Sequence, residues 1–359
     1  MHKKYIKGTH PSIAAVDRPP ASWRRLLVVR EFAESQIRWC LGKGFVDFWY
    51  DAWCGDLPLA LELGMSDPPH FLVGEFFTSQ GWNVPRLREW VPEAVVQRIA
   101  TIFFSPEQDD VMVWVPSPNG DFSVSSAWES RNLARFQAGI FTPTQVISQI
   151  EEFLGQMGRA RAFARPSFAG DWDCPWASLC NPTRRDMGTM LVSWEKPPTG
   201  WLKLNSDASV INGKAAGGGV LRDHWGRVVW AYYKEFGDLD VLAAEAQSLL
   251  FSLQLCVERG VSSLIVESDS RVLVQLVGSK ALSKWPLCTV LREITHHIGR
   301  LEATLLHVFR EANAVADALA SLQLGEHRLF ESLTALPSKA RGEARLDCHG
   351  VPRIRTGRC

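Results

Sequence analysis

The spacing of apolar residues becomes regular after Trp201 and stays regular to about Leu324. Alternating or continuous apolar residues predict strands at Leu202–Ser206, Gly217–Arg222, Arg227–Tyr233, Ser263–Glu267 and Thr304–Phe309. Helical spacing predicts helices at Val241–Glu258, Arg271–Val277, Leu287–Ile298 and Ala312–Leu322. Successive strands followed by helices that alternate with two more strands indicate an α/β domain. We expect a mixed five-stranded sheet flanked by helices, with strands 1–3 antiparallel and strands 4 and 5 added through helices.

The rest of the chain is less regular. We expect a flexible leader at 1–30 and an irregular Trp-rich region at 31–135, in which residues 113–124 read as a hairpin around a Pro-Asn-Gly turn. Residues 136–200 read as a linker with a short helix near 146–154, and Pro197-Pro198 marks its end. The compact domain is then 201–324, and 325–359 is expected to be a flexible basic tail.

Charge and cysteine content limit the classes of function. Lys and Arg total 39, Asp and Glu total 39, and the pI is about 7.1, so no general basic field marks a tight nucleic-acid binder. The eight cysteines form no CxxC pair, which favours reduced thiols. Since the chain has neither a long apolar run nor a signal-peptide pattern, we expect no membrane insertion and no secretion, with a location in the nucleus or cytoplasm.

Four carboxylates interrupt or end these elements. Glu245 lies on or beside the apolar stripe of its helix, where a carboxylate must be paired, protonated or metal-bound. Asp269 follows a strand at the end where α/β sheets bind ligands, although Ser268 or Asp269 could equally cap the next helix. Asp207 and Asp317 taken singly read as a turn residue and a solvated helix residue.

Taken together, these acids favour a metal site. If the first and fourth strands are neighbours, their carboxyl ends bring Asp207 and Asp269 together, and two helices can add Glu245 and Asp317. Two like charges about 4 Å apart repel by roughly 4 kcal/mol at an effective dielectric of about 20, so the cluster needs cations. Two Mg²⁺ ions suit such oxygen ligands, with Mn²⁺ as an alternative and no small-molecule cofactor.

Five runs in this region carry a family resemblance. They are Leu204–Ser209 (LNSDAS), Gly217–Asp223 (GGGVLRD), Ala244–Ala246 (AEA), Glu267–Ser270 (ESDS) and Arg310–Ala320 (REANAVADALA). In this order they closely resemble the type 1 ribonuclease H domain of plant LINE-type retrotransposons and their domesticated descendants. The resemblance implies the ribonuclease H fold, with metal-binding catalytic acids at Asp207, Glu245, Asp269 and Asp317.

The resemblance also extends upstream, with departures. Residues 42–53 and 114–127 look like segments that follow the reverse transcriptase in such elements, so 31–135 is interpreted as a remnant of that region. No Tyr-x-Asp-Asp polymerase motif is present, and the zinc-binding segment expected at 130–160 lacks its ligands. Many family members carry a histidine before the last helix; here His307 falls inside a predicted strand, and the short loop offers Arg310 instead.

The resemblance implies a monomeric endonuclease that hydrolyses the RNA strand of an RNA/DNA hybrid by in-line attack of a water and leaves a 3′-hydroxyl. Hybrid shape and 2′-hydroxyl contacts would give specificity. The candidate contacts are Ser209, Asn212, Gln247, Lys280, Lys284, Trp285, Arg310 and Asn313. A catalytically weak or inactive nucleic-acid-binding relic is the main alternative. A 3′–5′ exonuclease is disfavoured, because Ser209 stands where that group has a Glu two residues after its first Asp.

Overall fold

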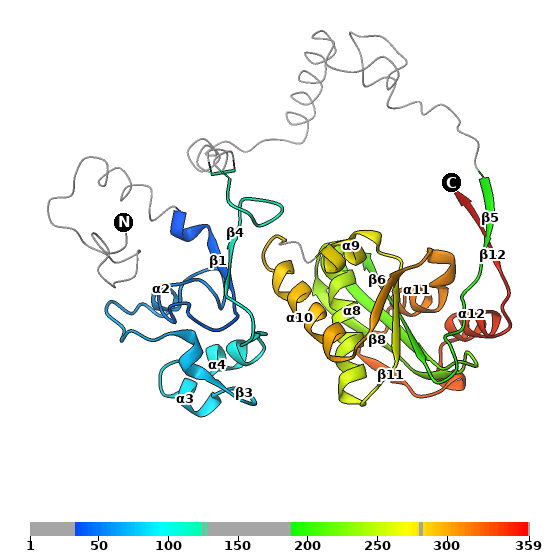
Figure 1. Cartoon of the computed structure of the whole chain (residues 1–359), viewed down its shortest axis with the longest axis horizontal. Helices are drawn as coiled ribbons and strands as arrows, with labels where there is room; N and C mark the ends of the chain where they lie inside the picture. Colours follow the sequence, from blue (N-terminus) through cyan, green and yellow to red (C-terminus); the bar gives the residue numbers. More distant parts are fainter. Residues whose placement is uncertain (1–32, 124–125, 128–187, 280–282, 358–359) are drawn as a thin grey trace, which may run out of the picture. The chain divides into compact units, whose positions relative to one another are not determined.

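The computed structural model describes residues 33–123, 126–127, 188–279 and 283–357 (Figure 1). The chain divides into two compact units, one made of 1–126 with 194–351 and the other of 127–193 with 352–359. The predicted leader, the short helix near 146–154 and Lys280 lie outside the described residues. In the second unit, β5 (Gly188–Val192) and β12 (Arg353–Gly357) form an antiparallel pair.

The N-terminal part of the first unit has its own aromatic core. Phe48 and Phe76 stack with ring centroids 4.3 Å apart, and Trp53 stacks on Trp82 at 5.7 Å. Its elements are β1 (Ile37–Cys40), α2 (Leu59–Glu62), the 3-10 helix η2 (Val73–Phe76), β2 (Phe77–Thr78), β3 (Gly81–Trp82), α3 (Val84–Arg88), α4 (Glu93–Ala100) and β4 (Val111–Trp114). The predicted hairpin at 113–124 is wrong, because β4 pairs antiparallel with β1 instead.

The C-terminal part is built on a six-stranded sheet in the order β10-β9-β6-β7-β8-β11. The strands are β6 (Leu202–Ile211), β7 (Lys214–Arg222), β8 (Val228–Asp238), β9 (Leu264–Ser268), β10 (Thr304–His307) and β11 (Arg328–Phe330). β6, β7 and β8 form the predicted antiparallel meander, and β9 and β10 add in parallel to β6. The predicted five-stranded mixed sheet is confirmed, including the neighbouring first and fourth strands, and β11 adds a sixth strand.

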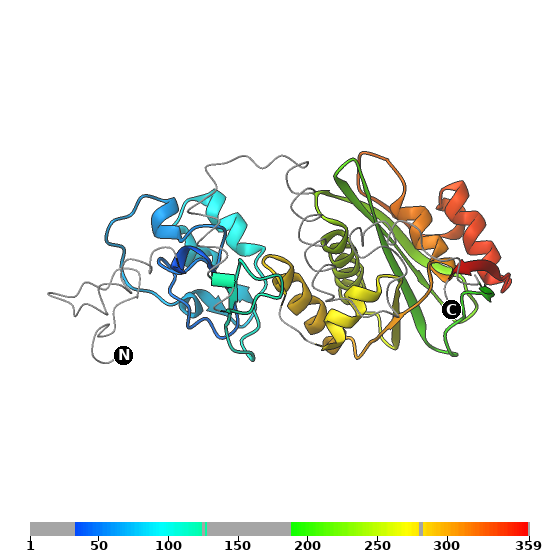
Figure 2. The same cartoon turned by 90° about the horizontal axis from the view of Figure 1, so that it is seen from above.

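Helices cover both faces of this sheet (Figures 1 and 2). One face carries α8 (Val241–Glu258), α9 (Arg271–Ser279) and α10 (Leu287–Arg300), and the other carries α11 (Ala314–Ala320) and α12 (Ser338–Cys348). Among the described residues α8 is the one helix long and apolar enough to cross a membrane, but its apolar side is buried in the core under the sheet. The short 3-10 helices η4 (Arg310–Ala312) and η5 (Leu333–Ala335) complete this part.

Glycines in β7 let helices approach the sheet closely. A Cβ built on Gly218 would lie 2.4 Å from the backbone nitrogen of Ala320 in α11, and one on Gly217 would lie 2.5 Å from Oγ of Ser248 in α8. Adjacent residues of a strand face opposite sides of the sheet, so each glycine makes room for a different helix. The distance of both helices from the sheet therefore depends on this strand.

The C-terminal region differs from the predicted flexible tail. Residues 328–348 supply β11, η5 and α12, and α12 contacts α11. The part of the predicted linker next to Pro197 is also ordered, since Trp194 is only 3% exposed. These flanking residues pack against the domain: β11 extends the edge of the sheet beside β8, while Asp347 of α12 and Trp194 both contact the buried Arg222.

Candidate metal centre and its support

Three of the four predicted acids meet at one end of the sheet. One carboxyl oxygen from each of Asp207, Glu245 and Asp269 lies within 4.8 Å of the other two. Asp207 is 5% exposed and Glu245 9% exposed, while Asp269 is half-buried. Three carboxylates at this spacing offer the oxygen ligands that Mg²⁺ and Mn²⁺ prefer.

Strand register explains the position of the two aspartates. β6 and β9 are parallel, and their last paired residues are Ser206 and Ser268. Asp207 and Asp269 each follow directly, so they lie at the same level, Asp207 within β6 and Asp269 just after the end of β9. The register also sets Asp207 opposite Gly218 in β7, whose missing side chain lets α11 come close to this face.

Helix α8 supplies the third acid. Asp240 caps this helix by accepting a 2.8 Å hydrogen bond from the backbone N–H of Ala243. Glu245, one turn later, faces the sheet and accepts a hydrogen bond from the backbone N–H of Ala208, the residue after Asp207. The hydroxyl of Ser248 donates to the backbone carbonyl of Asp207 at 2.7 Å, which fixes α8 against the strand beside the acids.

Burial and mutual repulsion raise the pKa values of Asp207 and Glu245. Burial, followed by the charges of Asp269, Glu245 and Asp317, raises the pKa of Asp207 to about 9. Burial and the charge of Asp269 raise the pKa of Glu245 to about 8. Without a cation, the group would therefore hold protons at neutral pH, and a divalent ion would replace them.

Asp317 lies near the cluster but is engaged elsewhere. The guanidinium of Arg310 forms an ion pair with its carboxylate, and Nζ of Lys339 lies 3.9 Å from Oδ2. Its carboxylate is not in the group of three, although its charge contributes to the raised pKa of Asp207. The structure thus places the fourth predicted acid beside the site as the partner of two cations.

The predicted substrate contacts fall into distinct surroundings. Ser209 and Asn212 line an open hollow of about 380 Å³ at the end of the β6–β7 hairpin, together with Tyr233 and Gln323. Arg310 is exposed beside the acids. The others are two half-buried residues, Gln247 and Trp285, and an exposed lysine, Lys284, which pairs with Asp240 at 2.8 Å. His307 belongs to β10, as predicted; it is the last residue of that strand, and its side chain is exposed.

Asn313 was predicted to contact the substrate, but its side chain is fully buried and does not reach the surface. Its Nδ2 donates to Oδ1 of Asp269 at 3.2 Å and to the carbonyl of Ser206 at 3.0 Å, while its Oδ1 accepts from Asn205 at 3.1 Å. It supports the acid cluster from inside the domain.

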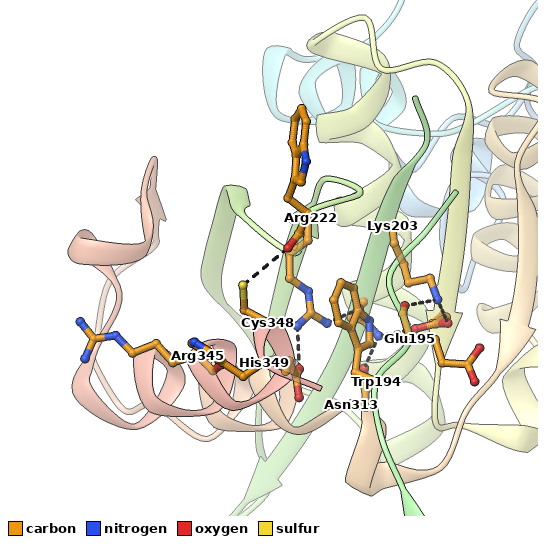
Figure 3. A network of polar contacts seen from close by, with 12 residues as sticks. Trp194, Glu195, Lys203, Arg222, Asn313, Arg345, Cys348 and His349 are labelled. Atoms are coloured by element: carbon orange, nitrogen blue, oxygen red, sulfur yellow. Dashed lines mark hydrogen bonds and ion pairs between the residues drawn. The ribbon is translucent and has the colours of Figure 1, made fainter. Parts of the chain in front are cut away.

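Sequence analysis also missed the polar network behind Asn313 (Figure 3). Its buried members are Trp194, Lys203, Asn205, Arg222, Glu267 and Asp347. Lys203 pairs with Glu267 at 2.6 Å, and Arg222 pairs with Asp347 at 2.6 Å. A signal was present in β6, where Lys203 and Asn205 alternate in step with Asp207 and so face the same side of the sheet.

Comparisons with known proteins match the segment that carries these acids. Residues 205–323 match the family model described as reverse transcriptase-like. Over 169 residues the chain is 31% identical to an Arabidopsis thaliana protein that bears the name ribonuclease H protein. Residues 205–323 form a ribonuclease H domain of the plant retroelement type. The aligned stretch is 46% of this chain and 27% of the Arabidopsis protein, so the chain spans about a quarter of that relative.

Solved ribonuclease H structures are also similar to this ribonuclease H domain. Ribonuclease H1 of Halobacterium salinarum is 22% identical, and the likeness covers 33% of this chain and 94% of that one with a TM-score of 0.30. LC11 ribonuclease H1 from compost, solved in complex with an RNA/DNA hybrid, is 22% identical, with 33% and 92% coverage and a TM-score of 0.31.

Proposed function

We propose that the ribonuclease H domain is a Mg²⁺-dependent endonuclease that hydrolyses the RNA strand of RNA/DNA hybrids. The observation that carries this proposal is that carboxyl oxygens of the buried Asp207 and Glu245 and of the half-buried Asp269 all lie within 4.8 Å of one another. Two buried carboxylates and a half-buried third gain nothing from an apolar core, so their presence supports a role as ligands of cations.

The residues divide the work as follows. Asp207, Glu245 and Asp269 would hold two Mg²⁺ or Mn²⁺ ions, with Asp317 as a further ligand once it leaves Arg310. When bound, the ions supply activation of a water and stabilisation of the leaving oxygen. Burial of Asp207 and Glu245 excludes solvent from the inner side of the acids, and both carboxyls release their protons when they become ligands.

Neighbouring side chains are placed to contact a hybrid. Arg310, exposed beside the acids, can turn its guanidinium from Asp317 to a backbone phosphate. Ser209 and Asn212 in the hairpin hollow offer a hydroxyl and an amide to the 2′-hydroxyls that distinguish RNA from DNA. Contacts to phosphates and 2′-hydroxyls favour recognition of a hybrid by its shape and its sugars over recognition by its base edges.

The test uses the full chain and a hybrid whose RNA strand is labelled at an internal position. We expect internal cleavage that needs Mg²⁺, is absent with single-stranded RNA and double-stranded DNA, and leaves a 3′-hydroxyl. Shortening only from one end would indicate an exonuclease. Hybrid binding with no cleavage in Mg²⁺ or Mn²⁺ would indicate a binding relic and would contradict the proposal.

A further inference from the structure

A line of hydrogen bonds joins α12 to the acid cluster, and Figure 3 shows two of its members, Arg222 and Asn313. Nη1 of Arg222 donates to Oδ2 of Asp347 at 2.6 Å, and Nη2 donates to Oδ1 of Asn205 at 2.6 Å. Nδ2 of Asn205 donates to Oδ1 of Asn313 at 3.1 Å. Nδ2 of Asn313 then donates to Oδ1 of Asp269 at 3.2 Å. Four consecutive hydrogen bonds thus connect a residue of the C-terminal helix with a candidate metal ligand.

The direction of every bond in this line is fixed. The guanidinium of Arg222 and the indole of Trp194 have only donors, so both N–H groups require the oxygen of Asn205 on their side. The amide nitrogen of Asn205 must then face the Glu267 carboxylate and the oxygen of Asn313. Reversing the Asn205 amide would set donor against donor on one side and oxygen against oxygen on the other.

The same reasoning fixes the last amide. With its oxygen accepting from Asn205, Asn313 turns its nitrogen toward the carbonyl of Ser206 and toward Asp269. Asp269 therefore meets a donor and never an amide oxygen. A donor on one carboxylate oxygen holds the group in a single rotamer and leaves the other oxygen to face a cation.

Two of the groups that hold Arg222 lie outside residues 205–323. Trp194 precedes this segment, and the Arg222 guanidinium carbon lies 3.6 Å from the centre of its ring. Asp347 follows it in α12 and is 1% exposed. Both Arg222 and Asp347 are buried, so their positions are set by each other and by the packing around them.

We propose that Asn313 is a positioning residue for Asp269, and that Arg222, held by Asp347 and Trp194, fixes its orientation through Asn205. The proposal rests on the proposed function only in requiring that Asp269 bind Mg²⁺. It assigns the flanking segments a role in metal binding. If the network only stabilised the fold, a change at Asp347 that left the protein folded would not alter metal binding by Asp269.

The test removes the Arg222 guanidinium and the Asp347 carboxylate together. Replacing a buried ion pair by apolar residues of similar volume is often neutral for stability, so the double variant Arg222→Met with Asp347→Leu should fold. We expect the side-chain amide NMR signals of Asn313 to move and the Mg²⁺ affinity, measured by calorimetry without hybrid, to fall about tenfold, as for lost partners of metal ligands. Glu331→Gln, which breaks the exposed pair with Arg259, is the control and should change neither.

A second measurement needs no variant. Titration of Mg²⁺ into the wild-type chain should move the side-chain amide signals of Asn313 and also those of Asn205, which donates to Glu267 and Asn313 and to no acid of the cluster. Asn205 signals that do not move, or a folded double variant with wild-type Mg²⁺ affinity, would overturn only the proposal that Arg222 acts on Asp269 through Asn205 and Asn313. Mg²⁺ binding without hybrid cleavage would overturn only the proposed function, and a wild type that binds no Mg²⁺ would overturn both.

Discussion

The guanidinium of Arg310 lies on the carboxylate of Asp317, with Nε donating to Oδ1 at 3.1 Å. This contact explains why Asp317 stays apart from the three acids that meet at the end of the sheet. The Arg310 guanidinium already pairs with the fourth carboxylate, so on the proposed function a second metal ion would have to compete with Arg310 for Asp317. Release of Arg310 and binding of that ion would then be coupled.

Arg310→Gln should raise the Mg²⁺ affinity of the substrate-free protein, because Asp317 loses its competing cation. The Arg310 side chain is 72% exposed, and exposed pairs contribute up to about 1 kcal/mol, so the gain should not exceed about fivefold. Affinity for hybrid should fall at the same time. Calorimetry on the metal-free protein measures the first effect, with Arg328→Gln, which breaks an exposed pair with Glu326, as the control. Weaker Mg²⁺ binding would show that Arg310 supports the metal site instead.

Asp269→Asn should abolish Mg²⁺-dependent cleavage, because the cluster loses a charged ligand next to both Asp207 and Glu245. Without metal, the same change removes like-charge repulsion and should stabilise the domain by up to about 4 kcal/mol where the acids are ionised. Cleavage and metal-free chemical denaturation are measured on the same two proteins. A less stable variant would indicate that Asp269 acts mainly as a helix cap, and equal cleavage would show that the site is assigned wrongly.

Stability of the metal-free protein should fall as pH rises. The folded-state pKa values of Asp207 and Glu245 are about 9 and about 8, above their ordinary values of 3.8 and 4.5. The folded state thus binds more protons between these limits, so its advantage is complete below about pH 4 and is lost as pH rises through the folded-state pKa values. Denaturation at about pH 5, 7 and 9 measures this, and Mg²⁺ should flatten the dependence. A metal-free protein equally stable across this range would contradict it.

Asp347→Asn should lower the free energy of unfolding by about 3–5 kcal/mol, because it leaves the buried Arg222 cation without its carboxylate. Glu331→Gln, at the exposed pair, should cost at most about 1 kcal/mol. The double variant Arg222→Met with Asp347→Leu should recover most of the loss. Urea denaturation of all four proteins gives the comparison. A loss as small as that at Glu331 would mean that solvent reaches Arg222.

Gly218→Ala should destabilise the domain and weaken its metal site. The added Cβ would lie 2.4 Å from the Ala320 backbone, so α11 must move away and carry Asp317 with it. Overpacking of this kind typically costs about 1–3 kcal/mol. Gly278→Ala in α9 is the control, since a Cβ there meets nothing within 4 Å and alanine favours a helix. Denaturation and Mg²⁺ calorimetry test both, and equal behaviour would show that α11 is free to adjust.

Five strands of the sheet and the meeting of three of the four acids could be predicted from the sequence for a physical reason. Helical spacing in 241–258 identified the core helix and, with it, the unusual position of Glu245. The predicted strand order sets Asp207 and Asp269 on neighbouring parallel strands, as the structure has them. These features depend on local periodicity and on a small set of allowed strand connections.

The polar network behind Asn313 could not be predicted, because alternating polar residues in a strand can face either water or a buried polar network. Lys203, Asn205 and Asp207 alternate with less polar residues in β6, a pattern typical of a face in water. Here α12 covers that face, yet it shows no strong apolar stripe, since the residues it buries are two alanines and Asp347. A pair such as Arg222 and Asp347, separated by 125 positions, leaves no periodic trace in the sequence.

The buried pair of Arg222 and Asp347 also has a consequence for how such a domain can be inherited. A gene rearrangement that kept only residues 205–323 would transfer the acids and Arg222 without Trp194 and Asp347. On the proposal that these two residues support the metal site through Arg222, such a shortened descendant would bind metal more weakly. The unit inherited with full metal affinity would then be wider than the segment that resembles other proteins.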